Sequence, residues 1–103
     1  MDEIEIKGKA TPEEIAAWKE KYGTVHEITV ENKRAYLKKL TRQSLSLALT
    51  FLGRDMVKFA ETVFENNFIG GEKDMIDDTD YLPGVIEECT MIVNGVKSSY
   101  VKH

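Results

Sequence analysis

Apolar residues recur with a helical period near the start of the chain, then with a strand period, and then with a helical period again. The first helical stretch begins at Thr11, where a threonine and a glutamate three positions later can form a capping box. Gly23 is a typical helix stop. We therefore predict a helix of about three turns between them. Its apolar stripe consists of Ile15, Trp18 and Tyr22.

The next stretch predicts a β-hairpin. Residues 25–31 are rich in β-branched side chains and partly alternate, and residues 34–40 form the returning strand. Asn32-Lys33 suits a two-residue turn because asparagine tolerates a positive φ. An isolated hairpin is only marginally stable in water. Its apolar face must therefore pack on helices or pair with a third strand, for which residues 3–7 are the candidate.

Three helices are predicted after the hairpin. The first, capped by Thr41 or Ser44, is apolar around most of its circumference, so we expect it to be buried on most sides. Gly53 breaks it, and Asp55 can cap the second helix. That helix ends at residues 66–71, where Phe68 and Ile69 are expected in the exit turn.

An acidic loop is predicted at residues 72–80, and the last helix follows it. Asp80 can cap this helix, and Asn94-Gly95 is expected to stop it. Its inner stripe is apolar and contains the cysteine of the chain. The stripe consists of Leu82, Val85, Ile86, Cys89, Ile92 and Val93.

The order of these elements predicts an α+β fold, with an N-terminal helix, a β-hairpin and then a cluster of three helices. The 103 residues fit a single domain, which we place at residues 11–95. Residues 1–10 are expected to be an edge strand or disordered, and residues 96–103 a short C-terminal tail.

Composition narrows the class of protein. Apolar residues make up 42% of the chain and charged residues 31%, which is typical of a folded domain. The net charge of −4 argues against nucleic-acid binding. Cys89 is the only cysteine, so no internal disulfide can form and a reducing, cytoplasmic location is expected. The sequence contains neither a signal peptide nor an apolar run of about 20 residues that could span a membrane.

The polar residues show no pattern that is typical of catalysis. The acidic loop lacks the glycine and the final glutamate of a calcium-binding loop and is better explained as a solvated turn. His26 and His103 are isolated, so they do not predict a metal site. Cys89 lies on an apolar helix face and is expected in the core. We therefore expect a protein that is not an enzyme and needs no cofactor or metal.

A cluster of basic residues is the one prominent charge feature. Lys33, Arg34, Lys38 and Lys39 lie on or beside the second strand of the hairpin, followed by Arg42. They could form a basic face that contacts RNA or an acidic protein. Alternatively, lysines could protect an edge strand from aggregation. We prefer the second interpretation to RNA binding, because the acidic total charge opposes it, and leave a protein partner open.

Two segments of the chain resemble a known family. Residues 28–45 (ITVENKRAYLKKLTRQSL) and residues 58–72 (KFAETVFENNFIGGE) are similar to the small tail assembly chaperones of bacteriophages and prophages. The helix predicted after Thr11 and the acidic residues 77–80 fit the same pattern, so the similarity spans residues 11–93. The resemblance implies a non-enzymatic chaperone that binds the tape-measure protein, the tail-tube protein or both while the tail is built.

Such a protein would bind its partners through apolar side chains that the core does not absorb. The candidates are Phe51, Met56, Phe68, Ile69, Met75 and Met91, together with the basic residues Lys33, Arg34, Lys38 and Lys39. Two alternatives remain open: a structural component of the virion, such as a tail or head-completion protein, and a small RNA-binding regulator. The sequence is also compatible with a homo-oligomer.

Overall fold

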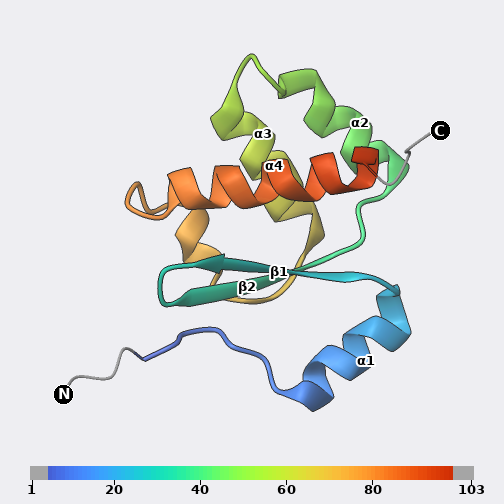
Figure 1. Cartoon of the computed structure of the whole chain (residues 1–103), viewed down its shortest axis with the longest axis vertical. Helices are drawn as coiled ribbons and strands as arrows, with labels where there is room; N and C mark the ends of the chain where they lie inside the picture. Colours follow the sequence, from blue (N-terminus) through green and yellow to red (C-terminus); the bar gives the residue numbers. More distant parts are fainter. Residues whose placement is uncertain (1–4, 99–103) are drawn as a thin grey trace.

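A three-stranded antiparallel sheet separates the N-terminal helix from the later helices of the chain (Figure 1). The computed structural model describes residues 5–98. The elements in chain order are α1 (Pro12–Tyr22), β1 (Val25–Val30), β2 (Lys33–Lys38), α2 (Arg42–Phe51), α3 (Met56–Asn67), β3 (Phe68–Gly71), a short 3-10 helix η1 (Lys73–Ile76) and α4 (Leu82–Ser98). The predicted α+β class and the order of helix, hairpin and helices are confirmed, and β3 is an addition.

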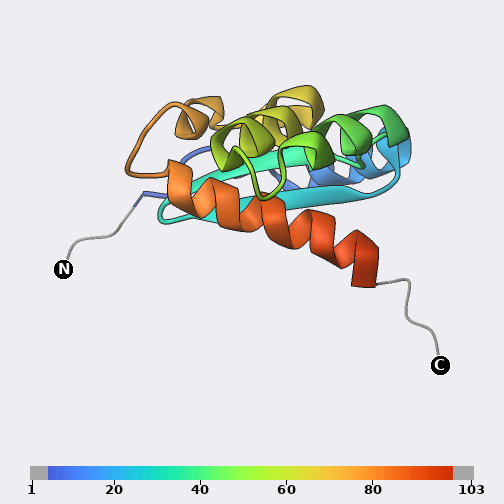
Figure 2. The same ribbon diagram turned by 90° about the horizontal axis from the view of Figure 1, so that it is seen from above.

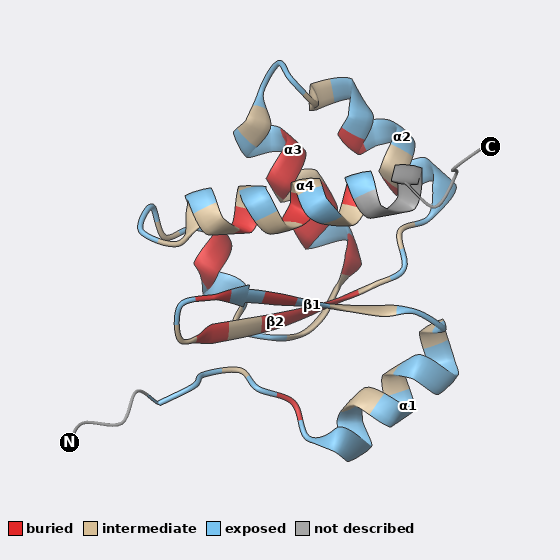
Figure 3. Cartoon of the chain, viewed as in Figure 1, coloured by how far each residue is buried: buried red, intermediate tan, exposed pale blue. Residues whose placement is uncertain are grey.

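The sheet face that carries the core is covered by α3 and α4. Figure 2 shows α4 beside the α2–α3 pair, with the hairpin beneath them. Alternate residues of the hairpin point into this core, since successive side chains of a strand face opposite ways. The buried cluster consists of Ile28, Val30, Ala35, Leu37, Ala48, Phe59, Ala60, Val63, Phe64, Met75, Ile76, Val85, Cys89 and Val93. Figure 3 places most of this buried surface on the sheet, α3 and α4.

The hairpin turns one residue earlier than predicted. Val30 pairs with Lys33, so the turn residues are Glu31 and Asn32, and Glu31 has a φ of 53°. Tertiary contacts explain this choice. The Asn32 side chain donates to the carbonyl of Glu5 and accepts from the Tyr81 hydroxyl. These bonds hold Asn32 at the second turn position and offset the cost of a left-handed glutamate, about 1 kcal/mol.

The third strand is β3, and the prediction of residues 3–7 was wrong for the part that is described. β3 pairs with β2 from Ala35↔Gly71 to Leu37↔Phe68, so Phe68 and Ile69 lie in a strand and not in an exit turn. Lys7 makes a single parallel bridge to Lys33. Residues 1–4 lie outside the described part. β3 is difficult to recognise from sequence because its glycines serve close packing: a Cβ on Gly71 would lie 2.5 Å from a β2 carbonyl oxygen.

Most helix boundaries follow local capping chemistry. Thr11 and Glu14 form the predicted capping box of α1, and Asp55 caps α3. The last helix differs at both ends. The Asp78 carboxylate, not that of Asp80, accepts a hydrogen bond in the turn before α4. The helix also continues through Asn94-Gly95 to Ser98, so the predicted stop was wrong. Residues 99–103 lie outside the described part.

Two predictions about burial were also wrong. α2 was expected to be buried on most sides, but only Ser44 and Ala48 of this helix are buried. Its principal packing partner is α3, so both of its flanks remain exposed. The acidic loop, in turn, contains η1, which buries Met75 and Ile76 in the core. Across residues 5–98, no helix combines the length and the apolar character that crossing a bilayer requires.

Candidate protein-binding surface

A groove separates α2 from α3 on the outer side of the helical layer. Leu47 and Phe51 line it from α2, and Lys58, Glu61, Thr62, Glu65 and Asn66 line it from α3. Its volume is about 280 Å³. A second hollow of about 330 Å³ adjoins it, because Leu47 and Asn66 line both. The second hollow extends toward the sheet and is also lined by Lys38, Thr41, Gln43, Ser44 and Asn67. We call the two together the Leu47 groove.

The α2 wall of this groove is apolar and accessible. Leu47 is 49% exposed and Phe51 is half-buried against the core cluster. Leu49, on the other flank of α2, is 42% exposed. The cause is the helical period: with 100° between successive residues, the two leucines lie on either side of Ala48, which faces the core. Two leucine side chains of α2 are therefore left exposed, one on each side of its core-facing residues.

The α3 wall of the groove is charged. Lys58 lies with its Nζ atom 5.8 Å from the centroid of the Phe51 ring. Glu61 and Glu65 follow one and two turns later along α3. Within the described residues, the two ion pairs join Lys33 to Asp74 and Arg34 to Glu27, so neither glutamate of the groove is neutralised by a salt bridge there.

The sheet end of the groove contains an unusual buried amide. Asn67 is 1% exposed, and its Nδ2 atom donates to the Val63 carbonyl at 2.8 Å. Its Oδ1 atom receives no hydrogen bond from the part of the chain that the structure describes. A buried acceptor without a donor costs roughly 1–3 kcal/mol. The unsatisfied Oδ1 atom of Asn67 therefore lowers the stability of the fold at the floor of the groove.

The apolar residues predicted for partner binding are dispersed over the fold. Phe51 alone lines the Leu47 groove. Met56 and Phe68 are partly buried against the core, Ile69 is half-buried in β3, and Met91 is 54% exposed on α4. The prediction for Met75 was wrong, because η1 carries it into the core with no exposed surface. Sequence reasoning missed Leu47, Leu49 and Val57, all more than 40% exposed.

The basic residues of the hairpin do not form one face. Because side chains alternate along β2, Lys33 points to the core face and Arg34 and Lys38 to the opposite face. Lys33 is buried, so its assignment to a basic contact surface was wrong. The edge-strand interpretation was wrong too, since β2 is the central strand. Lys38 borders the sheet end of the Leu47 groove, but its Nζ atom lies 5.7 Å from the centroid of the Tyr22 ring on α1. Lys39 is exposed just after the strand.

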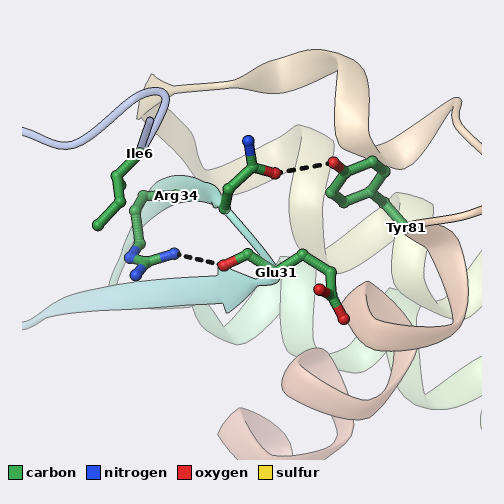
Figure 4. Close-up of a pocket in the computed structure, with 5 residues that line it drawn as sticks. Ile6, Glu31, Arg34 and Tyr81 are labelled. Carbon is green, nitrogen blue, oxygen red and sulfur yellow. Dashed lines mark hydrogen bonds between the residues drawn. The ribbon is translucent and has the colours of Figure 1, made fainter. Parts of the chain in front are cut away.

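Arg34 lines a separate hollow at the hairpin turn, away from the Leu47 groove (Figure 4). This hollow has a volume of about 430 Å³ and is lined by Ile6, Glu31, Asn32, Arg34 and Tyr81. Its polar groups bind one another: the Tyr81 hydroxyl donates to Asn32 Oδ1 at 2.9 Å, and Arg34 Nη1 donates to the carbonyl of Glu31 at 3.0 Å. The Tyr81 bond fastens the hairpin turn to the residue before α4, and the Arg34 bond closes the hairpin turn itself, so both are structural.

The titratable residues that the sequence brought into question are not grouped. Burial lowers the pKa of His26. Burial, assisted by the nearby charge of Glu88, raises the pKa of Cys89 to about 12. A thiol with such a pKa is protonated at neutral pH and is a poor nucleophile. In the part of the chain that the structure describes, no three His, Cys, Asp or Glu side chains are placed to hold a metal ion.

Comparisons with protein-family models, with curated proteins and with solved structures yielded no match.

Proposed function

We propose that this chain is a non-enzymatic phage tail assembly chaperone that binds the tape-measure protein, the tail-tube protein or both through the Leu47 groove. The exposed leucine at the centre of a groove is the observation that carries the proposal. Leu47 is 49% exposed, whereas the core-facing side of α2 carries Ser44 and Ala48. The resemblance to the chaperone family supplies the identity of the partners.

The energetics favour a reversible contact. Burial of apolar surface contributes about 25 cal/mol per Å², so covering the exposed half of one leucine contributes about 1 kcal/mol. A stable protein interface buries about 800 Å² on each partner, which is more than this groove alone offers. The groove is therefore the centre of the contact, and neighbouring exposed residues such as Leu49 and Val57 extend it.

A chaperone also needs a surface that accepts more than one sequence. Apolar contacts are not directional, so they tolerate changes in the partner better than a network of hydrogen bonds does. Leu47 and Phe51 provide such contacts, and the charged α3 wall keeps the open groove hydrated in the free protein. These properties support holding a partner for a time, and they do not require a catalytic group.

The test is retention of candidate partners by the immobilised chain. Candidate tape-measure and tail-tube proteins are co-expressed with this chain. We expect the wild-type chain to retain at least one of them, and Leu47→Gln to reduce retention about fivefold. Ile6→Gln is the matched control, because Ile6 is 44% exposed but lies at the hairpin turn, outside the groove.

Mass spectrometry of finished particles completes this test. A chaperone is absent from the mature tail, whereas a structural component of the virion is present in a fixed number of copies. Retention that Leu47→Gln leaves unchanged would contradict the groove as the binding site. If the chain is present in the particle in a fixed number of copies, it is a structural component of the virion and not a chaperone.

A further inference from the structure

The two walls of the Leu47 groove repeat with the same period but have different chemistry. On α2, Leu47 and Phe51 are four residues apart and make an apolar wall. On α3, Lys58, Glu61 and Glu65 are three and four residues apart and make a charged wall. Residues at these spacings lie about 5–6 Å apart on one side of a helix. The groove therefore offers two parallel rows of side chains with a helical repeat.

Such a groove fits a helix better than an extended strand. The backbone N–H and C=O groups along α2 and α3 are used within each helix, so they are not free to pair with a strand. An extended segment in the groove would leave its own backbone groups unpaired, which is costly when water is excluded. A helix satisfies its backbone internally and packs its side-chain ridges into a groove of the same repeat.

The order of charges along the groove indicates which helix fits. Glu61 and Glu65 stand one turn apart on α3, and Lys58 lies one turn before Glu61. A basic side chain placed centrally would meet two carboxylates, while an acidic side chain there would meet repulsion. The complementary helix therefore has Lys or Arg at its centre, on the flank of an apolar stripe.

We infer that the Leu47 groove accepts an amphipathic helix of a partner protein, with bulky apolar side chains against Leu47 and Phe51 and a Lys or Arg facing Glu61 and Glu65. This inference rests on the proposed function and adds the chemistry of the partner segment to it. The apolar wall supplies most of the binding energy. The two glutamates attract the basic flank of the partner helix, and this attraction fixes the rotation of that helix about its own axis.

Two synthetic helical peptides of about five turns test the inference. They share the same leucine stripe and differ only on one flank, where one has lysines and the other glutamates. We expect the full-length wild-type chain to bind the lysine peptide about tenfold more tightly at low ionic strength, and the difference to shrink in high salt. The double variant Glu61→Lys, Glu65→Lys should reverse the preference.

A second double variant controls for total charge. Glu20→Lys with Glu87→Lys changes the net charge by the same amount, but these two exposed glutamates lie on α1 and α4, away from the groove. It should keep the wild-type preference. Equal affinity for the two peptides, binding of neither, or the same reversal in this control would overturn the inference.

The outcome separates this inference from the proposed function. If Leu47→Gln weakens retention of the tail proteins and the peptides show no preference, the chaperone proposal stands. The inference that the groove selects a basic helix is then rejected. If the peptides behave as expected but no tail protein is retained, the groove binds a basic amphipathic helix and its source is not the tail.

Discussion

The ammonium nitrogen of Lys33 lies 4.3 Å from the centroid of the Tyr81 ring and 3.3 Å from each carboxylate oxygen of Asp74. The Lys33 side chain is 10% exposed, whereas that of Asp74 is 66% exposed. Burial alone would lower the pKa of Lys33, but the hydrogen bond with Asp74 and its charge raise it above its ordinary value. The contact ties β2 to η1 and to the turn before α4.

The difference in exposure predicts an asymmetric response to mutation. Asp74→Ala leaves the Lys33 cation covered but unpaired, which is unfavourable. Lys33→Met keeps an apolar stem against Tyr81 and leaves Asp74 hydrated. We therefore expect Asp74→Ala to lower the urea midpoint of unfolding clearly more than Lys33→Met. Equal losses would show that the pair acts mainly through its salt bridge and not through the covered cation.

The same pair predicts a dependence on alkaline pH. Because the folded pKa of Lys33 is raised, its contribution to stability is complete below the ordinary lysine value, 10.5. That contribution is lost as the pH rises through the higher folded pKa. Urea unfolding measured between about pH 9 and pH 11.5 should show a steeper loss for the wild type than for Lys33→Met. Parallel curves would contradict the raised pKa.

The position of α1 depends on one close approach. α1 has no buried residue, and Trp18 connects it to the sheet with its ring 5.3 Å from that of Tyr36. A Cβ on Gly70 would lie 2.6 Å from Cη2 of this ring. Gly70→Ala should therefore push the ring outward, at a cost of about 1 kcal/mol. Trp18 is the only tryptophan, so its fluorescence should shift to longer wavelength.

Gly53→Ala is the control for this experiment. No atom lies within 4 Å of a Cβ at Gly53, and its φ of 80° means that alanine there is strained. It should lower stability without changing the emission of the folded protein. An unchanged spectrum in Gly70→Ala would show that α1 rests on the sheet without this contact.

Local chemistry explains which parts of the fold could be predicted. Thr11, Asp55 and Gly23 act on the few residues around them, so the starts of α1 and α3 and the end of α1 were evident from sequence. β3 depends instead on a backbone approach between residues far apart in the chain. Gly70 and Gly71 permit it, but a pair of glycines also fits a turn, which was the prediction.

The proposed binding surface was hard to predict for a related reason. An apolar stripe on a helix predicts burial only if another element covers it. α2 has leucines on three sides, and the fold covers only the side that contains Ala48. Sequence cannot tell the covered side from the exposed ones without the position of α3. The leucines beyond the buried stripe were the available signal, and they predicted a central helix.

Cys89 provides a probe of unfolding. It is fully buried, and its pKa of about 12 keeps the thiol protonated at neutral pH. Iodoacetamide should therefore label the native chain only as fast as the protein opens. Leu47→Cys adds an exposed thiol in the groove as an internal standard, which should react at once. Rapid labelling of Cys89 in the wild type would contradict its burial between α4 and α3.

The buried amide of Asn67 predicts an unusually mild mutation. Its Oδ1 atom lacks a donor within residues 5–98, so Asn67→Ala removes an unsatisfied acceptor while it removes packing atoms. The two effects oppose each other, and we expect a net change in unfolding free energy below about 1 kcal/mol. Val63→Ala, one turn earlier and equally buried, should cost about 2 kcal/mol. Similar losses in both variants would indicate that Oδ1 is satisfied in solution.

Thr41 connects the stability of α2 to the partner binding proposed above. Its hydroxyl accepts from the Ser44 N–H at 3.0 Å, and the Ser44 hydroxyl is 3.1 Å from the Thr41 N–H, so the two residues cap the helix reciprocally. Both also line the sheet end of the Leu47 groove. Thr41→Ala should therefore cost about 1 kcal/mol of stability and loosen the wall that holds Leu47.

Thr11→Ala is the matched variant, because Thr11 and Glu14 form the equivalent capping box on α1, outside the groove. Urea unfolding should give comparable losses for the two threonine variants, since each removes one reciprocal cap. Retention of the tail proteins should differ: Thr41→Ala weakens it severalfold at a temperature where both variants are folded, and Thr11→Ala leaves it unchanged. Because the stability losses match, such a difference arises only if the order of α2 itself matters for binding. Equal retention by both variants would place the contact elsewhere on the molecule.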